Sequence, residues 1–122
     1  MFIYCNPNPC KTLVGDCVIR AISIAEQQSW EETYVELCGK GYTMCDMPSS
    51  NEVWGEYLNS KGYKCYVIPF PIYSVRQFCN DYKSGRYVVG TGSHAIAVID
   101  GDIYDTWDSS DETPAYYWRK EV

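Results

Sequence analysis

The stretch from Ser93 to Asp108 decides the fold, and it reads SHAIAVIDGDIYDTWD. An apolar run is followed by turn residues and then by a second run rich in Ile and Tyr. Two short runs of strand-forming residues separated by Asp and Gly predict a β-hairpin, with strands over residues 94–99 and 103–107. His94, the only histidine of the chain, lies at the beginning of this hairpin.

Helices are predicted upstream of the hairpin. Asp16 caps a helix over residues 17–27 that is apolar almost all round, which is typical of a buried helix. A capping box at residues 29–32 begins a second helix that ends near Cys38, before Gly39 and Gly41. A third helix begins within residues 48–52 and ends near residue 60, and a short fourth one spans residues 74–82.

The remaining strands are predicted over residues 64–68, 86–90 and 116–119. Helices come first and mostly sequential strands follow, which predicts an α+β fold with an antiparallel sheet. The length of 122 residues is that of one domain, so residues 1–122 are expected to form a single unit.

Composition excludes several classes of function. The net charge of −6 argues against nucleic acid as the main partner, because phosphate binding needs clustered Lys and Arg. The sequence contains no apolar run long enough to span a membrane. The N-terminal residues lack the basic and apolar regions of a secretory signal, so the chain is expected to be cytoplasmic.

Seven cysteines raise the question of disulfides and metals. Without a secretory signal, disulfides are not expected. No Cys-x-x-Cys pair occurs, and structural zinc normally uses such close ligand pairs. We therefore expect no metal and no cofactor, and most of the cysteines are expected to be small buried apolar residues. A zinc or redox protein remains an alternative because of the cysteine count.

Cys17 differs from the other cysteines because it opens the buried helix directly after a loop. A helix N-terminus carries partial positive charge and unpaired N–H groups, both of which favour a thiolate. A cysteine there, with a histidine and an acid elsewhere in the chain, is the pattern of a nucleophilic cysteine enzyme. Arg20, one turn later, is expected to form a structural ion pair rather than to bind a substrate carboxylate.

Two carboxylates compete to orient His94. If residues 100–102 form a three-residue loop, His94 lies directly opposite Asp108, with about 5 Å between the Cβ atoms. Asp105 would then lie roughly 10 Å along the strand and on the other face. A two-residue loop would bring Asp105 to the face of His94 but leave it too far along the strand. The sequence thus favours Asp108 as the orienting acid, with Asp105 as the alternative.

Three segments carry a resemblance: GDCVIRAI at residues 15–22, GSHAIAVIDG at residues 92–101, and YDTWD at residues 104–108. Together with WEETY at residues 30–34 and DMPSSN at residues 46–51, they resemble small proteins of gut bacteria and their phages that are interpreted as papain-like cysteine peptidases. These are broadly similar to the peptidase domains that process bacteriocin leaders. The resemblance implies a papain-like fold, with a buried helix carrying Cys17 packed on a sheet carrying His94 and an acid.

One position departs from the papain-like pattern. Such enzymes usually carry a Gln six residues before the nucleophile, where it donates to the oxyanion, and this chain has Lys11 there. Asn6, Asn8, Thr12 and the ammonium of Lys11 are the alternatives, and donor chemistry favours Asn8.

These residues predict a cysteine-dependent hydrolase of peptidase or amidase type with Cys17, His94 and Asp108 as a triad. Its expected partner is a peptide or protein substrate, and its intermediate is a thioester. The alternative is a non-catalytic binding or inhibitor protein of a phage or bacterium on a degenerate papain-like fold. The missing Gln, the acidity and the aromatic content favour that alternative.

Overall fold

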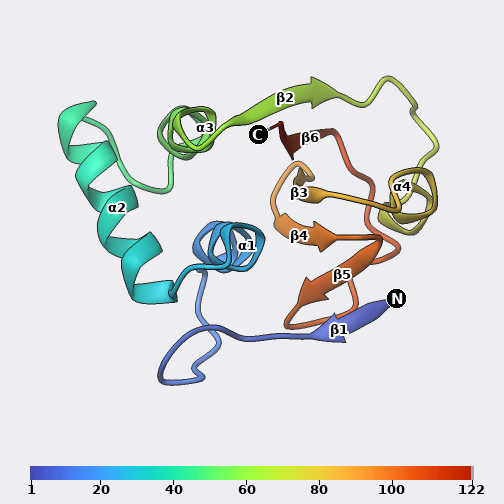
Figure 1. Cartoon of the computed structure of the whole chain (residues 1–122), viewed down its shortest axis with the longest axis horizontal. Coiled ribbons are helices and arrows are strands. Elements are labelled where there is room, and N and C mark those ends of the chain that lie inside the picture. Colours follow the sequence, from blue (N-terminus) through green and yellow to red (C-terminus); the bar gives the residue numbers. More distant parts are fainter. Residues whose placement is uncertain (122) are drawn as a thin grey trace.

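The computed structural model describes residues 1–121 and has an α+β fold, as predicted (Figure 1). Within these residues there are four helices and six strands. The helices are α1 (Cys17–Glu26), α2 (Trp30–Thr43), α3 (Asn51–Ser60) and α4 (Val75–Asp81). The strands are β1 (Phe2–Tyr4), β2 (Tyr63–Val67), β3 (Arg86–Gly90), β4 (Ala95–Ile99), β5 (Asp102–Asp105) and β6 (Tyr116–Lys120).

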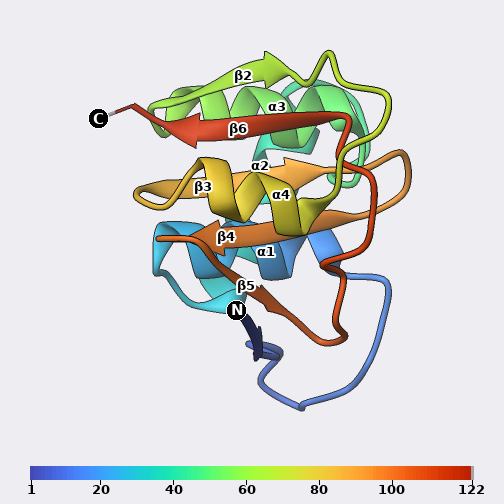
Figure 2. The same cartoon turned by 90° about the vertical axis from the view of Figure 1, so that its right-hand side faces the viewer.

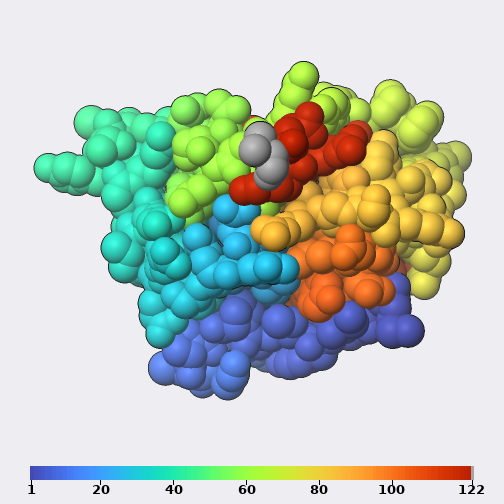
Figure 3. Space-filling view, viewed as in Figure 1, coloured from blue at the N-terminus to red at the C-terminus, as the bar shows by residue number. Residues whose placement is uncertain are grey.

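The strands form one sheet in the order β1-β5-β4-β3-β6-β2 (Figure 2). Every neighbouring pair is antiparallel except β1 and β5, which are parallel. The prediction of a purely antiparallel sheet is therefore wrong. Residues 2–4 lie next to turn-forming Asn and Pro and were too short a run to be predicted as a strand. In Figure 3 this N-terminal segment, in dark blue, lies along one edge of the molecule, and β6, in red, lies near the opposite one.

The helices cover the two faces of the sheet unequally. Helices α1, α2 and α3 lie on one side of the strands, and α4 lies on the other (Figure 1). The first core, between α1–α3 and the sheet, includes Ile22, Leu58 and Val88. The second core, under α4, includes Phe78, Ile96 and Val98. Alternate residues of β4 thus enter opposite cores, which explains why this strand reads as a continuous apolar run.

Helix α2 is longer than predicted because Gly39 and Gly41 do not end it. It continues to Thr43. A Cβ atom at Gly41 would lie 2.8 Å from the backbone oxygen of Asp46, so this glycine permits the chain after the helix to fold back closely.

The hairpin has a two-residue turn instead of the predicted three-residue loop. Ile99 pairs with Asp102, and both turn residues have positive φ, 50° at Asp100 and 82° at Gly101. These values are typical of the type I′ turn, for which Asp-Gly is a preferred sequence. The shift by one residue changes which side chains of β5 share a face with His94.

No helix in residues 1–121 is both long and apolar enough to cross a membrane. The seven cysteines are all free thiols, and only Cys79 is fully buried. The expectation that most cysteines are buried is therefore wrong, since Cys10, Cys45 and Cys65 are exposed. Over the same residues, no group of three or more His, Cys, Asp or Glu side chains has a metal-binding arrangement.

Candidate active site

Cys17 is the first residue of α1 and is half-buried, facing the beginning of β4. Asp16 occupies the N-cap position, yet its carboxylate makes no capping bond to the helix. That carboxylate accepts instead from Trp30 Nε1 at 2.8 Å and from Arg20. The N–H groups of the first turn of α1 are therefore not capped by this side chain.

His94 and Asp105 form a direct hydrogen bond. The Nε2 atom of His94 lies 2.7 Å from Oδ2 of Asp105. His94 precedes β4 rather than belonging to it, and Asp105 is the last residue of β5. The ring of Trp107 lies against the imidazole, with 5.1 Å between the ring centroids. The Trp107 ring thus covers one side of the imidazole, and Asp105 is held in place by its position at the end of β5.

Asp108 does not contact His94, so its prediction as the orienting acid is wrong. It is exposed, and its carboxylate accepts from the backbone and hydroxyl of Ser110. Continuing the observed register places Trp107 opposite His94 and Asp105 two residues along. The distance argument against Asp105 failed because His94 lies outside the strand, where its side chain reaches diagonally across the hairpin.

Asp105 is buried and accepts four hydrogen bonds. Besides His94, its donors are the Ser109 hydroxyl at 2.7 Å, the Thr106 N–H at 2.8 Å and Arg20 Nη2 at 3.4 Å. Burial alone would raise the pKa of Asp105, but hydrogen bonds from His94, Ser109 and Thr106 outweigh it and hold the pKa below its usual range. The carboxylate is therefore ionised at neutral pH and acts as an acceptor only.

Arg20 joins the helix that carries Cys17 to the strand that carries Asp105. Its guanidinium is buried and forms ion pairs with Asp16 and Asp105. The predicted structural ion pair is confirmed, and it connects Asp16, next to Cys17 in the chain, with Asp105 of β5. Because a buried unpaired charge is costly, each of the three groups depends on the others.

The electrostatics of Cys17 and His94 favour a charged pair. Burial would raise the pKa of Cys17, but hydrogen bonds from His94 and from the Ala95 N–H, with the positive charges of His94 and Arg20, lower it overall. Burial would lower the pKa of His94, but Asp105 and Cys17 raise it to about 9. A thiolate next to an imidazolium is the form that these shifts favour near neutral pH.

Asn8, the predicted oxyanion donor, is not among the residues that line the cavity of Cys17. It lines a separate cavity, and its side-chain oxygen accepts from the Cys10 N–H at 2.9 Å. The alternatives are also engaged elsewhere: Lys11 Nζ donates to Asn6 O at 2.8 Å, and Asn6 Nδ2 donates to Thr12 O at 3.3 Å. Sequence spacing failed here because residues 6–12 form a closed loop that hydrogen-bonds to itself.

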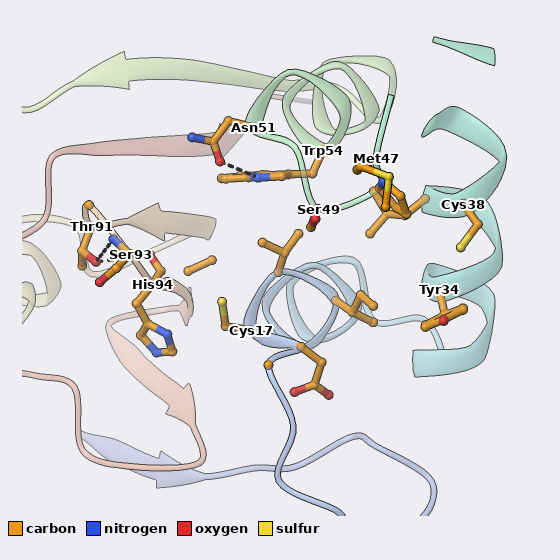
Figure 4. Close-up of a pocket in the computed structure, with 18 of the residues that line it drawn as sticks. Cys17, Tyr34, Cys38, Met47, Ser49, Asn51, Trp54, Thr91, Ser93 and His94 are labelled. Atoms are coloured by element: carbon orange, nitrogen blue, oxygen red, sulfur yellow. Dashed lines mark hydrogen bonds between the residues drawn. The ribbon is translucent and has the colours of Figure 1, made fainter. Parts of the chain in front are cut away.

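Cys17 and His94 open into a cavity of about 350 Å³ (Figure 4). Its walls come from α1, α2, α3, the loop before α3, the turn between β3 and β4, and Tyr116 of β6. Asn51 also lines the cavity, and its Oδ1 accepts from Trp54 Nε1 at 3.0 Å, while its Nδ2 group has no acceptor among residues 1–121. The reactive pair therefore lies at one end of a space large enough for a small ligand.

The sequence did not reveal the supporting roles of Ser109 and Trp107. Ser109 follows Asp105 by four residues in a turn, and nothing in its neighbours distinguishes it from other turn serines. None of the protein-family models, curated proteins and solved structures compared with the chain matches it. What the site can do chemically therefore follows from its own side chains.

Proposed function

We propose that this protein is a cysteine-dependent hydrolase that cleaves an amide or ester through a thioester on Cys17. His94 is the proton carrier and Asp105 orients it, in a papain-like arrangement of helix and sheet. The observation that carries the proposal is the 2.7 Å contact of His94 with the buried Asp105, together with the opening of Cys17 and His94 into the same cavity. These three residue types in this order are the parts that nucleophilic catalysis by cysteine needs.

The first half of the reaction forms the thioester. The thiolate of Cys17 attacks the carbonyl carbon of the substrate, and the negative charge moves to the carbonyl oxygen. The carbon–nitrogen bond then breaks, and the imidazolium of His94 gives its proton to the departing amine. Asp105, which accepts from Nε2, keeps the other ring nitrogen turned toward Cys17 and the amine.

The second half restores the enzyme. Neutral His94 removes a proton from water, which attacks the thioester and releases the carboxylic acid and the Cys17 thiolate. The charge on the carbonyl oxygen is stabilised in both halves by N–H groups at the start of α1, which the Asp16 side chain leaves uncapped. This backbone contribution takes the place of the Gln that the papain-like pattern carries six residues before the nucleophile.

The test is the pH dependence of cysteine alkylation by iodoacetamide, followed for each cysteine by mass spectrometry. The proposal expects Cys17 to react fastest, well below the pKa of about 8.5 of an ordinary thiol. Cys65 is the internal control, because it is open to the reagent while partial burial of its thiol raises its pKa. His94→Ala should remove the advantage of Cys17 and leave Cys65 unchanged.

Equal rates at Cys17 and Cys65 in the wild-type protein would contradict the proposal. The non-catalytic binding protein would then be the better explanation, and the cavity beside Cys17 would be examined as its binding site.

A further inference from the structure

The cavity begins beside Ser93 and His94 and extends past Cys17 toward α2 and α3. Figure 4 shows His94 on one side of Cys17, while Trp54, Met47 and Tyr34 lie on the other side, on or near α2 and α3. In the proposed reaction, His94 protonates the leaving group, so the leaving group must lie on the side of His94. The acyl part of the substrate is then directed into the cavity.

The walls of the cavity are mostly apolar. Val18 and Ile19 of α1, Leu37 of α2 and Trp54 of α3 contribute to them, and so does Tyr116. Gly90 lets the Tyr116 ring approach the backbone of β3 closely, since a Cβ there would lie 2.3 Å from the ring. The aromatic wall is therefore fixed by a backbone contact rather than by a flexible side chain.

The charges in this wall are already neutralised. Asp16 is the one carboxylate among the described lining residues, and no Lys or Arg belongs to them. The Asp16 carboxylate is buried and is occupied by Arg20 and Trp30. Beyond the Cys17–His94 pair, a charged acyl group entering the cavity would lose its hydration without meeting a side chain of opposite charge, whereas an apolar group would gain from leaving water.

We propose that the enzyme selects substrates whose acyl part carries a large, uncharged, apolar group, and that this group fills the cavity bounded by α1, α2 and α3. This inference rests on the proposed hydrolase function and adds its substrate class. The shared chemistry is an apolar group next to the reacting carbonyl. A linear acyl chain and an apolar amino-acid side chain are its two possible sources.

The test compares p-nitrophenyl esters that differ only in the acyl part. In this reaction the Cys17 thiolate forms a carbon–sulfur bond, the carbon–oxygen bond of the ester breaks, and p-nitrophenolate leaves with the electron pair. One arm compares the acetate with the hexanoate. The other arm compares the esters of N-acetylglycine and N-acetylphenylalanine. Mass spectrometry follows the rate of acylation at Cys17 and at Cys65, which corrects for the intrinsic reactivity of each ester.

In at least one pair, the larger ester should acylate Cys17 at least about tenfold faster than the smaller ester, after each rate is divided by the rate at Cys65. The reason is that the larger acyl group moves several more methylene equivalents out of water. The arm with the larger ratio identifies the source. If the larger and the smaller ester of each pair acylate Cys17 equally fast, while iodoacetamide still alkylates Cys17 fastest, the inference is overturned and the hydrolase remains. Loss of the iodoacetamide preference itself would instead remove the proposed function.

A pair of variants tests the location. Met47→Asp puts a carboxylate at the wall, and Met44→Asp, three residues earlier and outside the lining, is the matched control. Both methionines are exposed, so neither change disturbs the core. Met47→Asp should lower the ratio of the hexanoate rate to the acetate rate at Cys17, whereas Met44→Asp should keep that ratio at its wild-type value. The same preference in both variants would show that the apolar group lies elsewhere.

Discussion

Asp105 supports His94 from the end of the neighbouring strand, with 2.7 Å between its Oδ2 and Nε2 of the imidazole. The other oxygen of the same carboxylate accepts from Arg20 at 3.4 Å, and Arg20 belongs to the helix that begins with Cys17. One buried carboxylate therefore connects the histidine to the helix of the nucleophile. The position of the histidine and the position of the cysteine depend on the same ion pair.

Asp105→Asn is expected to slow the reaction at Cys17, whereas Asp108→Asn is not. The amide no longer supplies the charge that raises the pKa of His94, so less of the imidazolium–thiolate pair forms. At about pH 6, we expect iodoacetamide to alkylate Cys17 at least about tenfold more slowly in Asp105→Asn than in the wild-type protein. A tenfold change is the effect of a shift of one pKa unit. The measurement is the alkylation rate of both variants against pH.

Asp108 is the matched control because it is exposed and contacts Ser110 instead of His94. Similar losses in the two variants would contradict the assignment of Asp105.

The difference between these two acids shows how far the sequence could predict the site. Cys17 and His94 were found from their neighbours, because a loop-to-helix junction and a strand opening are local patterns. Choosing between the two acids required the register of the hairpin. The predicted register was wrong because it counted Asp102 as a loop residue, whereas Asp102 pairs with Ile99. The Asp-Gly dipeptide indicated the shorter turn. Even with that turn, the diagonal reach of His94 was not readable from strand spacing.

The pH dependence of turnover is expected to depend on the leaving group. The thiolate is lost as pH falls through the lowered pKa of Cys17, and the imidazolium is lost as pH rises through the His94 pKa of about 9. An anilide needs a proton on its leaving amine, so its turnover should fall on both sides and decline above about pH 9. A p-nitrophenyl ester leaves as an anion, so its acylation rate should fall only on the acid side.

The measurement is the rate for a p-nitroanilide and a p-nitrophenyl ester of one acyl group, over the same pH range. An anilide rate that keeps rising above about pH 9 would remove the role of His94 as acid.

Arg20→Met is expected to destabilise the fold strongly. It leaves the buried carboxylates of Asp16 and Asp105 without their shared positive charge. Removing one partner of a buried ion pair costs about 3–5 kcal/mol in free energy of unfolding. Arg76→Met is the control, since the Arg76–Asp111 pair is exposed and its loss should leave stability nearly unchanged. Urea denaturation of the two variants measures the difference, and equal midpoints would contradict the structural role of Arg20.

Much of the fold followed from local patterns, and the exceptions have physical causes. Helix α1 and strand β3 lie where capping residues and strand-forming residues predicted them. Strand β1 is stable because it pairs with β5, and the N–H of Ile103 also donates to the carbonyl of Met1. Only the folded chain brings β5 next to these residues. Helix α2 continues through two glycines because the loop after it packs against Gly41. In each case a distant contact overrides a local preference.

Gly90→Ala is expected to disturb the wall of the cavity, whereas Gly92→Ala is not expected to reduce stability. A Cβ at Gly90 would lie 2.3 Å from the Tyr116 ring, and β3 and β6 pair at this point, so the ring has to move. Overpacking of this kind costs about 1–3 kcal/mol in free energy of unfolding. A Cβ at Gly92 would meet nothing within 4 Å. Thermal or urea denaturation should separate the two variants, and a Gly90→Ala protein as stable as Gly92→Ala would mean that Tyr116 is not held against the strand.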